Sequence, residues 1–469
     1  MSEKSIPVER QPLPLADVAE IVSGYGFPKD MQGKTVGELP FFKVGDISAA
    51  WNSGQKKLIQ AQHYLDNAEA SAIKAKPFPK GTVVFAKIGE AIKLNRRAIL
   101  GQLSIVDNNV MGLIPKEGVV EQNYLFYWTL MLRLGDISQA TTVPSVRKSD
   151  VEQLSFPWVP LDQQKRIVAE IEKQFSRLDE AVANLKRVKA NLKRYKAAVL
   201  KAAVEGRLVE TEAERARREG RSYETGAQLL QRILETRRSQ WQGKGKYKDP
   251  AAPDTTDLPE LPEGWVWASV EQLTSDSLIG LDRGRDQQNA DGIGVPYVKM
   301  NNVTMDGEVT GDGIVYVDAS DEEKRRFNLK IDDLLFNTRN SKELVGKVGI
   351  VHTLPKEAIY NNNLMRLRMI DGTHPSFICT QMCSSGFRRR MELVKKATTN
   401  VAAVYAKDLF PLPIALPPVT EQHRIVSEVD RRLSVLRETE AQVDVNLQRA
   451  ERLRQSILSS AFGMTLQPN

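Results

Sequence analysis

The sequence is poor in the residues that metal sites and disulfide frameworks need. Among 469 residues there are two cysteines, Cys379 and Cys383, and four scattered histidines. A structural zinc site uses four Cys or His ligands, so we expect no metal site and no cofactor bound by this chain. The two cysteines stand one helical turn apart in the stretch FICTQMCSS, which we interpret as a buried helix.

Long apolar runs are also lacking. No stretch of 18 apolar residues occurs, and MSEKSIPVERQPLP at the start contains no apolar signal core. We therefore expect a cytoplasmic protein in a reducing compartment, without a membrane partner. The net charge of +7 and the pI of about 9.1 permit a nucleic-acid partner but do not require one.

Sequence motifs for methyl transfer, phosphate binding and nucleic-acid cleavage are missing. No Asn/Asp-Pro-Pro-Tyr/Phe methyltransferase motif is present. The stretch LVGKVG at 344–349 ends in Val where a phosphate-binding loop needs Ser or Thr for magnesium. The nuclease-like fragment EIEK at 170–173 lies on an expected helix and has no suitably placed upstream Asp. We therefore expect no catalytic residues and no enzyme activity in this chain.

What the sequence does contain is a long internal repeat. The phrase VPLDQQKRIVAEI at 159–171 returns as PPVTEQHRIVSEV at 417–429. Setting Pro160 on Pro418 gives an offset of 418 − 160 = 258, and Gln164 then falls on Gln422 and Arg166 on Arg424 without a gap. A fixed register over such a length indicates a duplicated unit. The period is too long for a solenoid, so we interpret it as two copies of a domain-plus-helix module.

A long helix is predicted after each copy of the phrase. Residues 162–204 contain neither Pro nor Gly, and apolar residues recur at every seventh position in both copies, which is the pattern of a coiled-coil seam. A second row follows Val168, Phe175 and Val182 and then shifts by one to Val188, Tyr195 and Ala202. The expected seam residues are Ile171, Leu178, Leu185, Leu192, Val199, Val429, Leu436, Val443, Ala450 and Ile457. We expect the two helices to pack on each other as an antiparallel coiled coil.

The remaining sequence predicts two mixed α/β domains. Short β-branched runs such as GTVVFAKIG and VGKVGIV stand between Gly, Asn and Pro. The fold class is therefore α+β with a pseudo-twofold internal repeat. The expected divisions are a first domain at 1–157, a first helix at 158–208, a charged helical and Pro-rich linker at 209–262, a second domain at 263–413 and a second helix at 414–469. The linker is expected to be mostly a solvated connector.

The order domain–helix–domain–helix resembles the specificity subunit of type I restriction–modification enzymes. LPPVTEQHRIV and VPLDQQKRIV are similar to the entry of that family's conserved regions, and LPELPEGWVW at 258–267 is similar to the opening of a variable domain. The resemblance implies that each variable domain is a target recognition domain for one half of a split, asymmetric DNA site. It also implies helices that set the spacing, and two modification subunits that carry S-adenosylmethionine and methylate adenine. Restriction subunits that use ATP and Mg would join that core in defence against foreign DNA.

Candidate DNA-reading residues lie on loops that follow strands. Base reading needs Arg, Lys, Asn or Gln in a groove, whereas phosphate contacts position the protein. The best loops are FNTRNSKELVGKVG in the second domain and FAKIGEAIKLNRRAIL at the equivalent place in the first. The full candidate set is Lys43, Lys87, Lys93, Asn95, Arg96, Arg97, Arg147, Lys148, Arg283, Arg285, Lys299, Asn301, Asn302, Asn337, Arg339, Asn340 and Lys342. For each single residue the alternative is a solvated surface charge.

Two other functions are compatible with parts of this pattern. A coiled-coil scaffold could join two protein-binding domains without touching DNA. A self-contained methylase–nuclease is disfavoured by the missing motifs. Salt dependence separates the first alternative from a DNA-binding subunit, because counterion release makes DNA affinity fall steeply with salt.

Overall fold

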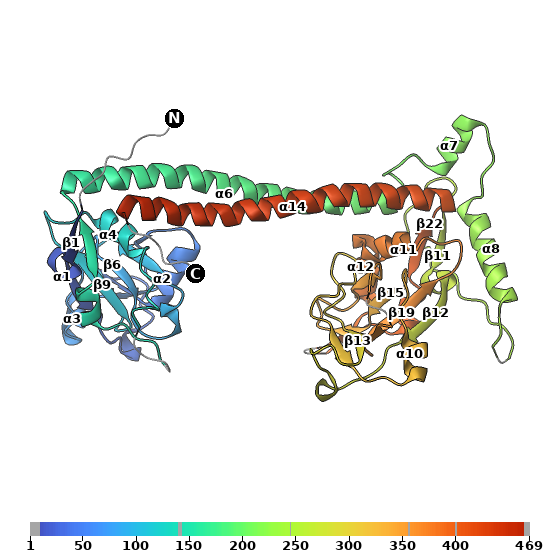
Figure 1. The fold of residues 1–469 in the computed structure, drawn as a ribbon, viewed down its shortest axis with the longest axis horizontal. Coiled ribbons are helices and arrows are strands. Elements are labelled where there is room, and N and C mark those ends of the chain that lie inside the picture. The colour runs from blue at the N-terminus through green and yellow to red at the C-terminus, as the bar shows by residue number, and fades with distance from the viewer. Residues whose placement is uncertain (1–9, 139–142, 244, 355–356, 399–400, 464–469) are drawn as a thin grey trace. The chain divides into compact units, whose positions relative to one another are not determined.

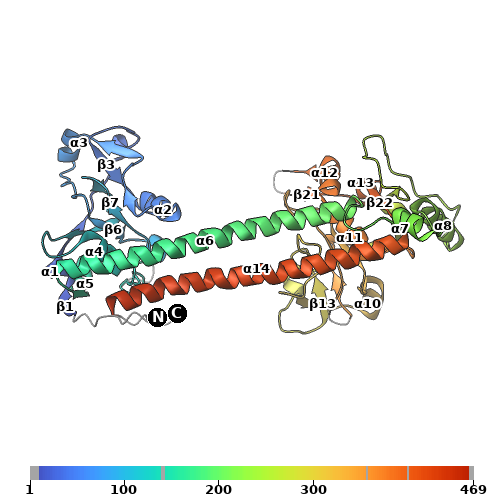
Figure 2. The ribbon, with the colours of Figure 1, turned by 90° about the horizontal axis from the view of Figure 1, so that it is seen from above.

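The computed structural model describes residues 10–138, 143–243, 245–354, 357–398 and 401–463. The chain divides into two compact units, one made of residues 1–187 with 443–469 and the other of 188–442. Each unit contains one α/β domain and a part of each long helix (Figures 1 and 2). In the described part of the chain, no helix is long and apolar enough to cross a membrane, and no three metal-binding side chains cluster.

The described residues of the first domain form three sheets. Its strands are β1 (Gln11–Pro14), β2 (Ala19–Ser23), β3 (Leu39–Phe42), β4 (Lys57–Leu58), β5 (His63–Leu65), β6 (Val83–Ala86), β7 (Arg97–Leu100), β8 (Ile105–Val106), β9 (Val110–Pro115) and β10 (Ser155–Trp158). Its helices are α1 (Leu15–Val18), α2 (Val44–Asn52), α3 (Asn67–Ala72), α4 (Gln122–Thr129) and α5 (Lys148–Glu152), with short 3₁₀ turns at Lys29–Met31 and Glu90–Ile92. The sheet orders are β2-β9-β6-β7-β4, β5-β3-β8 and β1-β10.

The second domain follows the same plan. Its strands are β11 (Val266–Ser269), β12 (Thr274–Ile279), β13 (Val295–Val298), β14 (Val315–Val317), β15 (Leu334–Asn337), β16 (Arg339–Asn340), β17 (Val348–Ile350), β18 (Ile359–Tyr360), β19 (Leu364–Met369), β20 (Lys396–Ala397), β21 (Ala402–Ala403) and β22 (Pro413–Leu416). Its helices are α9 (Val270–Leu273), α10 (Asp321–Phe327), α11 (Pro375–Cys383), α12 (Ser385–Val394) and α13 (Ala406–Leu409), with a 3₁₀ turn at Arg285–Gln287. The orders β14-β13-β18 and β11-β22 repeat those of the first domain. The order β12-β19-β15-β17 repeats β2-β9-β6-β7 without a counterpart of β4, and a small sheet β16-β21-β20 is added.

The central strands of both domains are short apolar runs that are buried along their whole length. VVFA in β6 and LLFN in β15 are buried at all four positions. Strands covered on both faces are expected to be continuously apolar rather than alternating. The expected buried helix around the cysteines is α11, in which Cys379 is buried and Cys383 is half-buried.

The two long helices are α6 (Leu161–Val204) and α14 (Val419–Phe462), each of 44 residues. Within the first unit, Val168 and Ile171 at the start of α6 share a core with Leu458 and Phe462 at the end of α14. Within the second unit, Val199 near the end of α6 shares a core with residues at the start of α14. The helices therefore pack on each other in opposite directions.

Burial along the expected seam is uneven. Ile171, Leu178, Val199, Val429, Leu436, Val443 and Ala450 are buried, whereas Leu185, Leu192 and Ile457 are half-buried. In the shifted part of the second row, Val188 and Tyr195 are wrong, because they are 40% and 48% exposed, whereas Ala202 is half-buried and packs against the core of the second unit. A strict heptad drifts around a straight helix, so a row that changes register leaves the facing surface.

The repeated phrase has a structural reason. Gln164 is fully buried, accepts a hydrogen bond from the Glu121 N–H at 2.7 Å and donates to the Val159 carbonyl at 2.7 Å. Gln422 is equally buried, accepts from the His374 N–H at 2.7 Å and donates to the Pro417 carbonyl at 3.0 Å. In each unit this amide ties the start of the long helix to the loop before a domain helix, α4 or α11.

Part of the linker is folded rather than solvated. It forms α7 (Glu212–Glu219) and α8 (Gly226–Ser239), and each begins with a Thr capping box. Leu229 and Ile233 of α8 are buried in the core of the second unit. The expectation of a mostly solvated connector is therefore wrong for these two helices.

Candidate nucleic-acid interface

Two lysines occupy equivalent positions at the ends of β3 and β13. Lys43 Nζ donates to Gln32 Oε1 at 2.8 Å, and Lys299 Nζ donates to Gln288 Oε1 at 3.0 Å. In both pairs the glutamine stands 11 residues before the lysine. Lys43 also lies 5.0 Å from the centroid of the Phe27 ring. Both lysines are half-buried, so a neutral amide holds each ammonium group in place without neutralising its charge.

The first-domain loop after β6 carries both surface and buried polar groups. Lys93 is exposed and pairs with Glu90 at 2.9 Å. Lys87 is half-buried, and burial lowers its pKa although nearby Asp107 opposes the shift. Asn95 adopts a φ of 54°, a left-handed conformation that asparagine tolerates, and its side chain bonds to the Leu132 carbonyl at 3.1 Å. The loop is therefore held in shape by Asn95, with Lys87, Lys93 and the half-buried Arg96 around it.

The structure brings the segment of Arg147 and Lys148 beside this loop. The Val146 N–H donates to the Lys87 carbonyl at 2.8 Å, and the Gly89 N–H donates to the Pro144 carbonyl at 2.8 Å. Arg147 and Lys148 are exposed, and Lys148 pairs with Glu152 at 3.6 Å.

In the second domain, the loop after β15 lies beside the segment of Ala403 and Val404. The Val404 N–H donates to the Thr338 carbonyl at 2.9 Å, and Arg339 in β16 pairs with Ala403 in β21. Arg339 and Lys342 are exposed, whereas Asn340 is half-buried and donates to Asn337 Oδ1 at 2.7 Å.

Lys396 in β20 of the same small sheet and Tyr405, which follows β21, were not among the sequence candidates. Lys396 Nζ lies 5.6 Å from the centroid of the Tyr405 ring, and both side chains are exposed. Lys395 donates to the Lys342 carbonyl at 2.8 Å and so joins α12 to the loop. The doublet Lys395–Lys396 was the available signal in the sequence, but only strand pairing places it beside Arg339.

The remaining candidates lie near the β12 and β13 loops. Arg283 makes a bidentate pair with Glu323 at 2.9 and 3.0 Å, so this guanidinium is engaged within the domain. Arg285 and Asn301 are exposed.

Three candidates are fully buried and belong to the domain interiors. Arg97 donates to the Leu132 carbonyl at 2.6 Å, and burial lowers its pKa to about 9. Asn302 accepts from the Lys299 N–H at 2.9 Å, and Asn337 donates to the Asn363 carbonyl at 3.0 Å. Side chains with no exposed surface cannot enter a groove, so we correct these three from candidate contacts to structural residues.

The sequence matches a known protein family and known members of it. The family described as "Type I restriction modification DNA specificity domain" matches residues 7–194 and 283–444. The chain is 24% identical over 357 residues to the EcoKI specificity subunit of Escherichia coli K12, covering 75% of this chain and 67% of that protein. It is 22% identical over 440 residues to the EcoDI specificity subunit of Escherichia coli, covering 93% and 88%.

Solved structures share the fold. One, described as "Structural basis underlying complex assembly and conformational transition of the type I R-M system", has a TM-score of 0.65 at 18% identity and covers 98% of this chain and 99% of its own. The HsdS subunit from Thermoanaerobacter tengcongensis has a TM-score of 0.51 at 17% identity and covers 97% of both chains.

The family match spans well over half of the sequence and confirms the prediction of a non-catalytic subunit. The chain belongs to the family of type I restriction–modification DNA specificity subunits.

Proposed function

We propose that each α/β domain reads one half of a bipartite, asymmetric DNA site. The observation that carries this proposal is the duplicated domain: apart from β4 and the added sheet β16-β21-β20 the strands follow corresponding orders, and the same Lys–Gln pair stands in both copies. Two domains that share a fold but differ in their surface loops are suited to reading two different DNA half-sites. Within each domain, the loop after β6 or β15 reads bases. The lysine after β3 or β13 contacts the DNA phosphates and so positions the protein on the duplex.

The contacts of the second domain follow from exposure and charge. Arg339, Lys342 and Lys396 are exposed cations on one small sheet and its loop, and Tyr405 adds an exposed ring. Arginine binds guanine through two hydrogen bonds, and such a contact contributes about 1–3 kcal/mol of discrimination. In the first domain the corresponding set is Lys87, Lys93, Arg96, Arg147 and Lys148.

The long helices have the spacing role in this proposal. Two antiparallel helices of 44 residues hold the two domains at a set separation and give one chain the pseudo-twofold symmetry that suits two identical modification subunits. Those subunits bring S-adenosylmethionine and methylate adenine, and restriction subunits with ATP and Mg join them. The complex works in the cytoplasm on double-stranded DNA.

A binding-site selection tests the half-site assignment. Arg339→Ala should relax or change one half of the selected motif and leave the other half at parental stringency. Arg325→Ala on α10 is the control, because Arg325 is an exposed arginine outside the candidate loops. The parental motif at parental stringency for Arg339→Ala contradicts the assignment.

Salt dependence distinguishes the scaffold alternative. A DNA-reading subunit assembled with modification subunits should lose affinity steeply between low and moderate salt. The pure chain should transfer no methyl group unless a modification subunit is added. DNA affinity that is flat in salt, or methyl transfer by the chain alone, contradicts the proposed function.

A further inference from the structure

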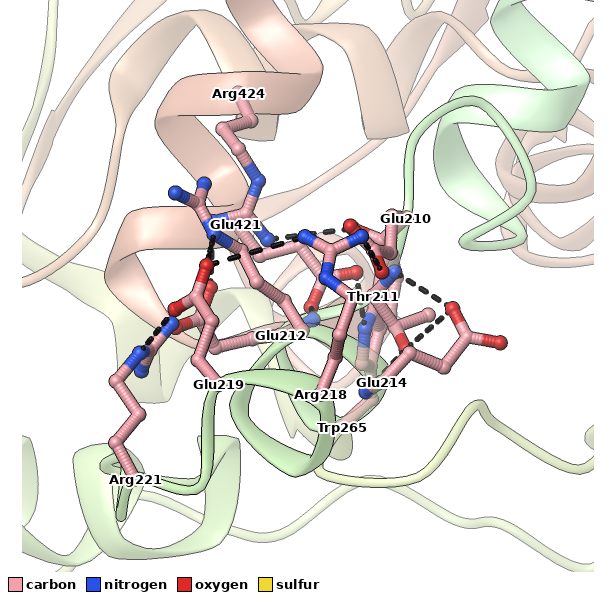
Figure 3. A network of polar contacts seen from close by, with 11 residues as sticks. Glu210, Thr211, Glu212, Glu214, Arg218, Glu219, Arg221, Trp265, Glu421 and Arg424 are labelled. Carbon is pink, nitrogen blue, oxygen red and sulfur yellow. Dashed lines mark hydrogen bonds and ion pairs between the residues drawn. The ribbon is translucent and has the colours of Figure 1, made fainter.

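The buried charges at the start of α14 are satisfied by the chain itself (Figure 3). Glu212, the first residue of α7, is buried, and its carboxylate lies between the guanidinium groups of Arg221 and Arg424. The Glu212 N–H donates to one carboxylate oxygen of Glu421 at 2.8 Å, and the Trp265 indole N–H donates to the other at 2.9 Å. Both oxygens of each carboxylate have partners, so this network is a structural joint between α7 and α14.

A different joint connects the second domain to both long helices through one turn. The turn comprises residues 304–308, between β13 and β14. Asp306 pairs with Lys196 of α6 at 2.6 Å, and Glu308 pairs with Arg437 of α14 at 3.4 Å. All of these residues belong to the second unit, so the turn is a contact between the domain and the helices of that unit.

Two thiols converge on Gly307 of this turn. Cys379 and Cys383 stand one helical turn apart on α11, and Cys379 Sγ lies 3.5 Å from the Gly307 carbonyl oxygen. A methyl group at the Cβ position of Gly307 would lie 3.4 Å from Cys379 Sγ and 3.1 Å from Cys383 Sγ. Apart from Gly307 and its two chain neighbours, no other described heavy atom lies within 4 Å of that position. The two sulfurs therefore border a methyl-sized space.

The thiol pair is accessible through Cys383. Cys379 is 4% exposed, whereas Cys383 is half-buried, so a small ion from solvent meets Cys383 first. A hydrogen bond between the two thiols lowers the pKa of Cys383, and the Arg388 guanidinium adds to this shift although burial opposes it. Arg388 is held in place by donating to the Met305 carbonyl at 2.9 Å. The thiolate is the form of cysteine that binds metal ions.

The spacing of the thiols suits a bridging ion better than a disulfide. Side chains four residues apart on a helix have Cβ atoms about 5–6 Å apart. A disulfide needs Cβ atoms about 3.5–4.5 Å apart, so its formation would distort the end of α11. A thiolate–metal bond is about 2.3 Å long for zinc, and an ion between two sulfurs therefore spans the wider spacing. Among the metal ions, Cu(I) is of the soft class that thiolates prefer.

We propose that Cys379 and Cys383 form a two-thiolate site for a soft monovalent metal ion of the Cu(I) class. Each sulfur donates an electron pair to the ion and releases its proton to solvent, so two protons leave for each ion bound. No group is oxidised or reduced. The complex carries one net negative charge, which the Arg388 guanidinium offsets. The ion fills the space beside Gly307 and so couples metal binding to the turn at 304–308. The site does not depend on the reading of DNA.

Three other uses of the thiol pair fit less well or make a different prediction. A structural zinc ion needs four ligands, and in the described part of the chain no three His, Cys, Asp or Glu side chains gather. A redox couple needs a disulfide, which the helical spacing opposes. Packing of the thiols in the core, without a ligand, predicts that the chain takes up no ion.

The test is transfer of Cu(I) to the full chain from a chromogenic Cu(I) chelator, in reducing, oxygen-free buffer without DNA. We expect one ion per chain. Cys383→Ser should weaken the affinity about tenfold or more, because one of two soft ligands is lost. Cys383 is half-buried, so this variant should retain the fold, which thermal unfolding checks. Cys379→Ser should weaken the affinity to a similar extent.

The matched control keeps two thiols on α11 at the wrong spacing. Adding Thr380→Cys to Cys383→Ser places the thiols at positions 379 and 380, and adjacent side chains do not face each other on a helix. This double variant should bind Cu(I) no better than Cys383→Ser alone. In the wild type, Cu(I) should also slow hydrogen exchange in residues 304–308, and in Cys383→Ser it should not.

Each contrary result overturns a stated part of the inference. No uptake by the wild type, unchanged uptake by Cys383→Ser, or restored uptake by the double variant would overturn the site itself. Uptake that needs both cysteines but leaves exchange in residues 304–308 unchanged would overturn the placement of the ion beside Gly307. Because these measurements contain no DNA, such failures are distinguishable from a failure of the proposed function, which binding-site selection tests.

Discussion

In both units a buried glutamine joins the domain to the start of its long helix, whereas the ion pairs between the domain and α6 have opposite polarity. In the first unit a domain cation, Lys56, pairs with Glu172 of α6 at 3.5 Å. In the second unit the domain residue is an anion: Asp306 pairs with Lys196 of α6 at 2.6 Å. Gln164 and Gln422 bond to main-chain groups, which any sequence provides, so this joint survives divergence of the surface. Exposed ion pairs contribute little and are free to change sign.

Removing either glutamine should have the largest effect on stability. Gln164→Leu and Gln422→Leu leave a buried N–H and buried carbonyls unpaired, at about 1–3 kcal/mol for each unsatisfied group. Each variant should destabilise mainly the unit that contains it. Hydrogen exchange followed by mass spectrometry reports the two units separately. Gln174→Leu is the control, because Gln174 is half-buried on α6 and, within the described ranges, bonds to the exposed side chain of Glu170. Equal effects of the control and the two buried variants would contradict the common joint.

Arg424 and Arg166 should differ strongly although they occupy equivalent positions. Arg424→Met leaves Glu212 buried with Arg221 as its remaining ion-pair partner, and we expect a loss of about 2–3 kcal/mol in the second unit. Arg166→Met should change stability by less than about 0.5 kcal/mol, because it is exposed. Denaturant unfolding monitored by exchange in α7 and α6 measures both. Similar losses would show that the two helix starts are equivalent after all.

The pH dependence sharpens the same contrast. Burial raises the pKa of Glu421, although hydrogen bonds from Glu212 N–H and Trp265 oppose the shift. A carboxyl with a raised pKa contributes stability that is full below the unfolded pKa and is lost as pH rises through the folded pKa. Glutamine does not titrate, so Glu421→Gln lacks this pH-dependent contribution to stability. The wild type should therefore gain stability relative to the variant as pH falls from 7 toward 4.5.

Glu212 has the opposite slope. Burial opposes ionisation, but Arg424 and Arg221 outweigh it and hold the pKa of Glu212 below its usual value. Its contribution is therefore present above the unfolded pKa and lost as pH falls through the folded pKa, in both proteins. Melting temperatures of wild type and Glu421→Gln across this range check the difference. A constant difference would contradict the burial effect at Glu421.

The smallest effects are expected at the ion pairs of opposite polarity. Lys56→Ala and Lys196→Ala should each cost less than about 1 kcal/mol, because all four carboxylate and ammonium groups retain contact with solvent. Raising salt should shrink both losses. A loss above about 2 kcal/mol in one unit would show that its domain is attached by charge rather than by the glutamine.

Some of this organisation could be predicted from sequence and some could not. The limits of α6 follow from a stretch without Pro or Gly and from apolar periodicity, which are local signals. Burial of Arg97, Asn302 and Asn337 was missed because position after a strand does not say which way a side chain points. The neighbourhood of Arg339 and Lys396 depends on pairing between β16, β20 and β21, which no local pattern reveals. The helical character of the linker was expected, but the burial of Leu229 and Ile233 of α8 was missed because their core partners lie far away in the sequence.

The central claim is that two copies of one module read two half-sites at a separation set by the helices. Inserting one heptad between Leu185 and Leu192 and one between Val443 and Ala450 keeps the seam in phase. Seven residues add about 10.5 Å at 1.5 Å each, which is close to three base pairs at about 3.4 Å. Three base pairs also turn the duplex by roughly 100° at about 10.5 base pairs per turn. Methylation-site mapping in cells should give a longer gap between unchanged half-sites, or weaker methylation through mis-phasing. An unchanged gap at full methylation would contradict the account.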